Sequence, residues 1–194
     1  MDRVGSPSVT SICLVRHGET AWNSEGRLQG REDVPLNDRG RDQARKLADA
    51  LAVDRWDLLV SSPLCRAWET ATIMAARLGL PEPVAIPELM ERDYGAASGL
   101  TKVEAARRFP DGVYPASETR ADVRGRCWPV LERLATRSAG GSALVVTHGS
   151  VIKSLLLAIS DGAIPAADLR NACSNLIYRT ADSPWQIIHH DRTV

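Results

Sequence analysis

The 194-residue sequence lacks an excess of charge of either sign, because 24 lysine and arginine residues balance 24 aspartate and glutamate residues. A neutral chain creates no general field that would attract nucleic acid or an anionic membrane surface. Any site for an anion must therefore be built locally. Lysine is scarce, and the basic residues other than Lys46, Lys102 and Lys153 are arginine or histidine. Genome base composition explains this bias most simply, although arginine also suits bidentate recognition of phosphate.

Cysteine pairs and long hydrophobic runs are also missing. The cysteines form no CxxC pair and have no histidine at zinc-finger spacing, which favours reduced thiols: Cys13, Cys65, Cys127 and Cys173. The polar start, Met1 to Thr10, has no signal-peptide core, and the apolar run near Leu155 to Ile159 is too short to cross a bilayer. We expect a cytoplasmic monomer or homodimer that binds neither nucleic acid nor a membrane.

Signatures of nucleotide and metal sites are absent from the sequence as well. It has no Walker-type phosphate loop and no acidic or histidine-rich cluster at metal-ligand spacing. The length predicts one domain over residues 1–194, long enough for a three-layer core. Glycine, proline and charged residues loosen the pattern at about 88–125, which predicts a short cap-like insertion over the sheet edge.

Apolar segments of strand length alternate with segments of helical periodicity. This alternation predicts an α/β fold, a three-layer α/β/α sandwich around a mainly parallel sheet. Strands are predicted at about 12–15, 57–61, 84–86, 143–147, 172–179 and 185–189, and helices at about 38–51, 63–78, 102–109, 118–137 and 150–159. Residues 26–37 are predicted to form a long loop, and Pro129 is expected to bend its helix.

The most informative stretch is Leu14-Val15-Arg16-His17-Gly18, an apolar run that ends in a cation and an imidazole. Open α/β sheets place their ligands at the carboxyl ends of strands. A second predicted strand ends in His148-Gly149, and parallel strands deliver both histidines to the same sheet edge. Position alone leaves a hydrogen-bonded structural histidine as the alternative in each case.

Further motifs follow the first in a fixed order. They are Arg16 to Asn23, Arg27-Leu28-Gln29-Gly30, Ser61 to Ala67, Leu89 to Gly95, and Val145 to Gly149. In this order they resemble the histidine phosphatase superfamily, which includes the phosphoglycerate mutases. The resemblance covers the chain from about Ile12 to about Ile159.

The resemblance implies specific roles for the matched residues. His17 corresponds to a nucleophile that attacks phosphorus and forms a phosphohistidine, and His148 to a residue that binds the phosphoryl group beside it. Fixed cations and donors stabilise the charge on the phosphoryl oxygens, and Arg16, Arg66 and Asn23 match such positions. The remaining matched substrate-binding positions are Gln29, Gly30 and Gly149. Neither a metal nor another cofactor is implied.

The leaving oxygen needs a proton at neutral pH, which a carboxylic acid can give. Glu91 matches the acid position of the family. On chemistry alone four other glutamates stay open: Glu19, Glu69, Glu88 and Glu118. Arginines outside the phosphate-binding positions are interpreted as part of a solvated surface: Arg27, Arg31, Arg39, Arg41 and Arg45.

The segment from Glu91 to Lys102 resembles the mutase branch, in which residues matching Tyr94 and Lys102 help to bind phosphoglycerate. Only 57 positions separate Glu91 from His148, however, whereas mutases have a much longer insertion. A short cap excludes water less well, which favours hydrolysis. We therefore predict a metal-independent phosphomonoester hydrolase that acts on a small metabolite. Candidate substrates are phosphoglycerate derivatives, sugar phosphates and alpha-ribazole phosphate. A bisphosphoglycerate-dependent phosphoglycerate mutase is the alternative, and an inactive phosphate-binding or regulatory protein is less favoured.

Overall fold

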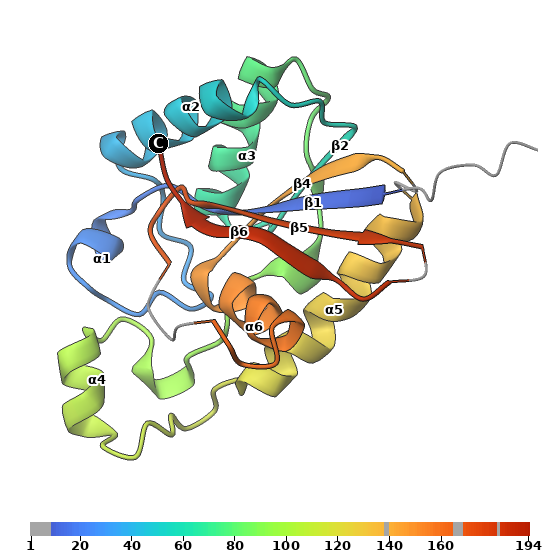
Figure 1. The fold of residues 1–194 in the computed structure, drawn as a ribbon. Helices are drawn as coiled ribbons and strands as arrows, with labels where there is room; N and C mark the ends of the chain where they lie inside the picture. The colour runs from blue at the N-terminus through green and yellow to red at the C-terminus, as the bar shows by residue number, and fades with distance from the viewer. Residues whose placement is uncertain (1–8, 138–139, 165–168, 182) are drawn as a thin grey trace, which may run out of the picture.

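The computed structural model describes residues 9–137, 140–164, 169–181 and 183–194. Six strands form one sheet in the order β3-β2-β4-β1-β5-β6 (Figure 1). Their bounds are β1 Val9–Arg16, β2 Leu58–Ser61, β3 Val84–Ala85, β4 Ser142–Thr147, β5 Ser174–Thr180 and β6 Gln186–Arg192. Strands β3, β2, β4 and β1 are parallel, whereas β5 runs antiparallel to β1 and β6 antiparallel to β5. The predicted mainly parallel sheet is confirmed.

The helices cover both faces of this sheet. The regular helices are α1 Ala21–Ser24, α2 Asp38–Leu51, α3 Cys65–Leu78, α4 Lys102–Arg108, α5 Arg120–Arg137 and α6 Gly149–Ile159, and the short 3-10 helices are η1 Pro87–Leu89 and η2 Gly95–Ala97. Figure 1 shows α2 and α3 on one side of the sheet and α5 and α6 on the other. None of the helices in the described ranges is long and apolar enough to cross a membrane.

Two hydrophobic cores follow from the alternation of side chains along β1. Ile12 and Leu14 pack in the core that α5 and α6 close, whereas Cys13 and Val15 pack in the core that α2 and α3 close. All four residues are at most 1% exposed. The continuous apolar run therefore reflects a strand buried on both faces, and the predicted three-layer sandwich is confirmed.

The helix boundaries show how local sequence signals act. Asn37 caps α2 by accepting a hydrogen bond from the Gly40 N–H, and Gly79 ends α3 in the left-handed conformation, at φ 65°. Helix α3 begins at Cys65, two residues after Pro63, and α5 continues through Pro129. The four-residue helix α1 was not predicted, because four residues are too few to show a period.

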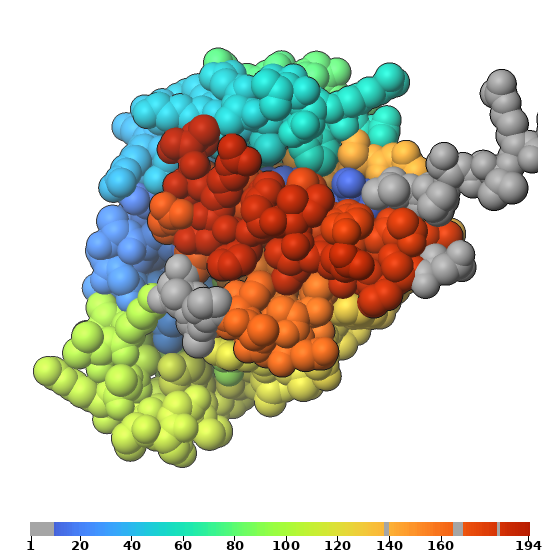
Figure 2. Space-filling view, in the orientation of Figure 1, coloured from blue at the N-terminus to red at the C-terminus, as the bar shows by residue number. Residues whose placement is uncertain are grey.

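The segment between β3 and α5 has little regular structure. It contains η1, η2 and α4, which begins with a capping box between Thr101 and Glu104. Figures 1 and 2 show α4 and the residues around it projecting from one end of the molecule. Residues 120–125, at the end of the expected insertion, are the first turns of α5, and Val123 lies in the core.

Candidate active site

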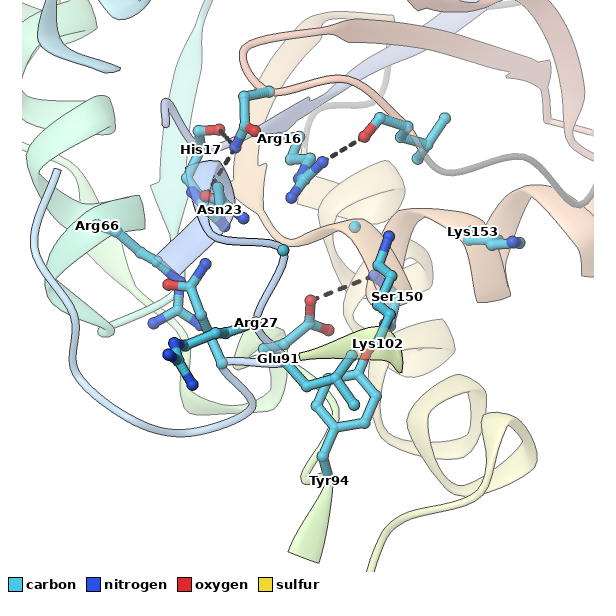
Figure 3. Close-up of a pocket in the computed structure, with 16 residues that line it drawn as sticks. Arg16, His17, Asn23, Arg27, Arg66, Glu91, Tyr94, Lys102, Ser150 and Lys153 are labelled. Carbon is cyan, nitrogen blue, oxygen red and sulfur yellow. Dashed lines mark hydrogen bonds between the residues drawn. The ribbon is translucent and has the colours of Figure 1, made fainter. Parts of the chain in front are cut away.

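A cavity of about 190 Å³ opens at the carboxyl ends of β1 and β4. The register of these parallel strands pairs Arg16 with Thr147, so His17 and His148 follow at the same level. Four of the five expected catalytic residues line the cavity: Arg16, His17, Arg66 and Glu91. In Figure 3, Arg16 and His17 lie at one end of the group and Tyr94 at the other, with Glu91 between them.

The His17 imidazole is buried, with 2% of the residue exposed. Its Nδ1 lies 2.7 Å from the Gly18 carbonyl oxygen, which accepts a hydrogen bond from an N–H at this position. Burial lowers the pKa of His17 well below 6.5, and the nearby charges of Arg66 and Arg16 lower it further. A neutral ring with its proton on Nδ1 leaves a lone pair on Nε2, as a nucleophile requires.

The fifth expected catalytic residue, His148, is fully buried beside His17, and the two ring centroids are 5.1 Å apart. Its Nε2 lies 2.8 Å from the Ser62 hydroxyl oxygen, a partner that the sequence analysis did not single out. Burial lowers the pKa of His148 well below 6.5, and the charge of Arg66 adds to this effect. When the Ser62 hydroxyl donates to Nε2, the proton of the neutral ring lies on Nδ1.

The two expected phosphate-binding arginines are held by backbone carbonyls rather than by carboxylates. The Arg66 guanidinium is fully buried and donates to Glu32 O at 2.7 Å and to Gly30 O at 2.8 Å. Arg16 donates from Nη1 to Leu169 O. Burial lowers the pKa of Arg66, so its charge lies in a poorly solvated site. Carbonyl partners orient the two guanidinium groups without neutralising them.

Buried polar atoms without a hydrogen-bond partner gather at this site. Among the side chains that the structure describes, four such atoms occur: Arg16 Nε, Gln29 Oε1, Arg66 Nε and His148 Nδ1. All four belong to residues that the sequence assigned to the site. Buried polar groups in folded proteins almost always have partners. Three N–H donors from two arginines and a histidine would all be satisfied by the oxygens of one phosphoryl group.

Asn23 also presents donors to the cavity, because its oxygen is fully engaged. Its Oδ1 accepts from the Thr20 N–H and the Thr20 hydroxyl, each at 3.1 Å, within the capping box of α1. The Asn171 Nδ2 donates to the same oxygen at 3.1 Å. Three donors fix the orientation of the Asn23 amide, which leaves its NH₂ group for an acceptor. No motif or periodicity in the sequence points to Asn171, whose position depends on the turn that precedes β5.

Among the described residues that line the cavity, one is acidic, and it is Glu91. It is 8% exposed, and its Oε1 accepts from the Arg92 N–H at 2.7 Å and its Oε2 from the Ser150 N–H at 3.3 Å. Figure 3 shows this carboxylate between Tyr94 and the two residues Arg16 and His17. The other glutamates that chemistry left open do not line the cavity: Glu19, Glu69, Glu88 and Glu118.

The outer part of the cavity carries further polar and cationic groups. The expected substrate-binding residues Tyr94, Lys102, Gln29 and Gly149 line it, together with Lys153. The Tyr94 hydroxyl lies 2.6 Å from the Ser150 hydroxyl, and burial raises its pKa to about 12. Tyr94 is therefore a neutral hydrogen-bonding group at physiological pH.

Two matched glycines act through their backbones. Gly30 does not line the cavity, but its carbonyl holds Arg66 and its φ of 54° lies in the left-handed region. Gly149 begins α6, and a Cβ there would lie 3.4 Å from Arg16 Nε. Both glycines therefore affect the positions of Arg16 and Arg66, the arginines expected to bind phosphate.

Arg27, interpreted as a surface arginine, has 36% of its side chain exposed but also lines the cavity, which the sequence analysis did not predict. Its backbone pairs with Thr101, which folds the loop against the start of α4. The Arg27 guanidinium pairs with Glu25 at 2.5 Å and donates to Gly99 O at 2.9 Å. A loop without a period gives no sign of which side chains turn inward, so sequence patterning could not place it.

The described residues around the site lack a cluster of metal ligands. Within the part of the chain that the structure describes, no three His, Cys, Asp or Glu residues are grouped so that they could hold a metal ion. The partners of His17 and His148 are a carbonyl and a hydroxyl. The arrangement instead combines a neutral imidazole, cationic donors and one carboxyl group.

Comparisons with known proteins identify a family of phosphatases, which agrees with the geometry of the site. The sequence model of the family described as "Histidine phosphatase superfamily (branch 1)" matches residues 12–192. The chain is 40% identical over 182 residues to the uncharacterized phosphatase PhoE of Bacillus subtilis, covering 92% of this chain and 93% of that protein. It is 35% identical over 192 residues to the metal-independent phosphoserine phosphatase of Arabidopsis thaliana, covering 92% and 80%. Proteins named as phosphoglycerate mutases also match.

A solved structure gives the same result for the fold. The mycobacterial glucosyl-3-phosphoglycerate phosphatase in complex with VO3 superimposes with a TM-score of 0.85 at 26% identity, covering 94% of this chain and 99% of that one. The resemblance inferred from the motifs is thus confirmed by both sequence and structure. The chain belongs to branch 1 of the histidine phosphatase superfamily.

Proposed function

We propose that this protein is a metal-independent phosphomonoester hydrolase that works through a phosphohistidine on His17. Its family and its phosphatase-named relatives support a phosphomonoesterase. One observation carries the proposal furthest: the unpartnered donors Arg16 Nε, Arg66 Nε and His148 Nδ1 occur beside a neutral buried imidazole. Donors fixed before the substrate arrives stabilise developing phosphoryl charge without reorganisation.

In the first step, Nε2 of His17 attacks phosphorus and the bond between phosphorus and the leaving oxygen breaks. Arg16, Arg66 and His148 hold the phosphoryl oxygens. Glu91, in its protonated form, gives its proton to the leaving oxygen, so a neutral alcohol departs.

In the second step, water attacks the phosphorus of phosphohistidine. The Glu91 carboxylate takes a proton from this water as the new P–O bond forms. The bond between phosphorus and Nε2 breaks, which returns its electron pair to His17 and releases inorganic phosphate. Both steps use the same donors, because the phosphoryl oxygens stay in place while the groups on either side exchange.

The substrate we propose is a small phosphomonoester whose leaving group carries a second anionic group. Lys102, Lys153 and Arg27, which also pairs with Glu25, line the cavity in addition to the two proposed phosphate-binding arginines, whereas Glu91 is the one carboxylate among the described lining residues. A cavity of about 190 Å³ suits a small metabolite. Phosphoserine and phosphoglycerate derivatives have a carboxylate of this kind, and relatives named for such substrates support this class.

Hydrolysis is favoured over mutase activity because the segment between Glu91 and His148 is short. The described part of this segment that lies outside α5 and β4 provides one regular helix, α4. A mutase must keep water from its phosphohistidine until the intermediate reacts again. We also keep as predictions a cytoplasmic location and a monomer or homodimer.

Phosphate release measured with EDTA tests this function. We expect turnover of para-nitrophenyl phosphate to continue in the chelator. With 3-phosphoglycerate and added 2,3-bisphosphoglycerate, phosphate release should exceed formation of 2-phosphoglycerate. Loss of turnover with EDTA would contradict metal independence, and isomerisation faster than phosphate release would establish the mutase alternative.

A further inference from the structure

Glu91 belongs to a segment whose backbone is held from outside by one arginine. The segment lies between η1 and η2 and has no helix or strand of its own around Glu91. Arg126 of α5 donates from Nη1 to Glu88 O at 2.5 Å and to Met90 O at 2.7 Å. It also donates from Nη2 to the carbonyl of Glu91 itself, at 3.1 Å. One guanidinium therefore supplies hydrogen bonds to three carbonyls of this segment. The Thr147 hydroxyl and the Cys127 thiol donate to the carbonyls of Leu89 and Glu88.

Arg126 is itself oriented by Glu118, which precedes α5. The Arg126 Nε donates to Glu118 Oε1 and the Nη2 to Oε2, both at 2.9 Å, so the pair is bidentate. Each side chain is 18% exposed. Burial lowers the pKa of Arg126, but the hydrogen bond to Glu118 and the neighbouring charges of Glu118, Cys127 and Glu91 together outweigh burial, so the net pKa is raised. Both partners therefore stay charged at neutral pH.

Glu118 forms hydrogen bonds with the same segment on the C-terminal side of Glu91. Its Oε2 accepts from the Asp93 N–H at 2.9 Å, and its own N–H donates to Asp93 O at 2.9 Å. The backbone is thus held at residues 88, 90, 91 and 93 by a single ion pair. We name this arrangement of Arg126 and Glu118 the acid clamp.

We propose that Arg126 of the acid clamp is a positioning residue, which holds the Glu91 carboxyl group where it exchanges a proton with the leaving oxygen. Arg126 does not line the cavity, so it would act on the reaction indirectly, and Glu91 is the cavity residue whose backbone carbonyl it holds. Within the described residues, the carboxyl group accepts hydrogen bonds from two backbone N–H groups, those of Arg92 and Ser150. Proton transfer needs heavy atoms within about 3.2 Å, so a small backbone displacement removes the acid from reach. This inference rests on the proposed role of Glu91.

A series of phosphate esters with leaving groups of different pKa gives the test, because only poor leaving groups need a proton. We expect Arg126→Ala to lower kcat for alkyl phosphates by about a hundredfold, in the range of general acid catalysis. Hydrolysis of para-nitrophenyl phosphate should fall by less than about fivefold, since nitrophenolate leaves without protonation. Glu118→Gln should likewise lower kcat for alkyl phosphates more than kcat for para-nitrophenyl phosphate.

Arg133→Ala is the matched control. Arg133 lies on the same helix and pairs with the Glu88 side chain at 3.0 Å, yet has no recorded hydrogen bond to the carbonyls of Met90 or Glu91. Its removal should leave the dependence on leaving-group pKa unchanged. If Arg126→Ala does not fold, as judged by circular dichroism, Arg126→Lys takes its place, because an ammonium cannot span the same set of acceptors.

A double-mutant cycle separates this inference from the proposed function. If Arg126 acts through Glu91, the Glu91→Gln variant has already lost the effect of Arg126. Adding Arg126→Ala to that variant should then lower kcat for alkyl phosphates by less than about a further threefold. Equal losses across the ester series for the Arg126 variants would overturn the positioning role. If Glu91→Gln itself shows no dependence on the leaving group, the proposed acid is wrong instead, and the positioning role falls with it.

Discussion

Gly40 in the first turn of α2 lies against the backbone of Glu19, so closely that a Cβ on Gly40 would be 2.1 Å from the Glu19 carbonyl oxygen. The contact is reciprocal, because a Cβ on Gly18 would lie 2.3 Å from the Gly40 carbonyl oxygen. Gly18 and Glu19 directly follow His17. The start of α2 therefore supports the loop that fixes the orientation of the proposed nucleophile.

We predict that Gly40→Ala displaces this loop, lowering the free energy of unfolding by about 1–3 kcal/mol, as overpacking does, and reducing kcat. Gly125→Ala is the control, since Gly125 is also helical but a Cβ there would meet no atom within 4 Å. That variant should gain up to about 1 kcal/mol of stability with unchanged activity. Urea unfolding and steady-state kinetics measure both effects, and similar behaviour of the two variants would contradict the contact argument.

Asn171→Ala is predicted to weaken phosphate binding by freeing the Asn23 amide to rotate. Asn171 also donates to the carbonyls of His17 and Gly18, at 3.2 and 3.3 Å, so the loop loosens as well. We expect the inhibition constant of inorganic phosphate to rise by about tenfold, the cost of one charge-assisted hydrogen bond. Asn175→Ala removes a comparable buried bond, to Leu14 O at 3.0 Å, and should lower stability but leave phosphate inhibition unchanged.

The free energy of unfolding should fall as the pH is lowered from about 6.5 toward 5. In the folded chain, burial holds the pKa of both His17 and His148 well below 6.5, so neither histidine takes up a proton there. The unfolded chain binds those protons, which stabilises it by at most about 1.4 kcal/mol per pH unit for each histidine.

Urea unfolding between pH 8 and pH 5 measures this slope. Below the folded-state pKa values the slope from these two groups should vanish, since folded and unfolded chains then bind the same protons. The variant His148→Asn should lose one histidine's share of the slope. An identical slope in the variant and the parent would show that His148 is protonated in the folded enzyme.

Lys102→Ala should raise KM for carboxylated substrates and spare para-nitrophenyl phosphate. A lysine that recognises a remote carboxylate contributes binding that only such substrates receive. Lys46→Ala is the control, because Lys46 is a lysine outside the lining of the cavity. An unchanged preference for phosphoserine over para-nitrophenyl phosphate in the Lys102 variant would assign this residue to the solvated surface.

The sequence predicts the layers and the meeting of the two His-Gly segments because both follow from general rules. Continuous apolar runs at residues 12–15 and 143–146 indicate strands buried on both faces, and parallel strands end at one edge. The antiparallel β5 and β6 were also predicted as a pair. The extent of the regular structure in residues 88–119 was less clear, because glycine, proline and charge obscure the period.

Residues that act through tertiary contacts were not predictable from patterns. Arg27 resembles any loop arginine until the pairing with Thr101 turns it toward the cavity. Arg126 lies in an amphipathic helix, and its partners are backbone carbonyls, which a sequence does not distinguish. Asn171 contacts Asn23 across 148 positions of the chain, a separation that only the fold closes.

The measurement that tests the central claim most directly is the capture of a phosphoryl group on His17 during turnover. An ester with a good leaving group makes formation of the phosphoenzyme fast relative to its hydrolysis. A radiolabelled ester of this kind would be mixed rapidly with the enzyme and quenched in alkali, in which phosphohistidine is stable. We predict alkali-stable, acid-labile label on the peptide that contains His17, no label in His17→Ala, and loss of turnover in that variant by at least about a thousandfold with the fold intact. An unlabelled parent enzyme at saturating substrate, or a His17→Ala variant within about tenfold of the parent activity, would contradict the account.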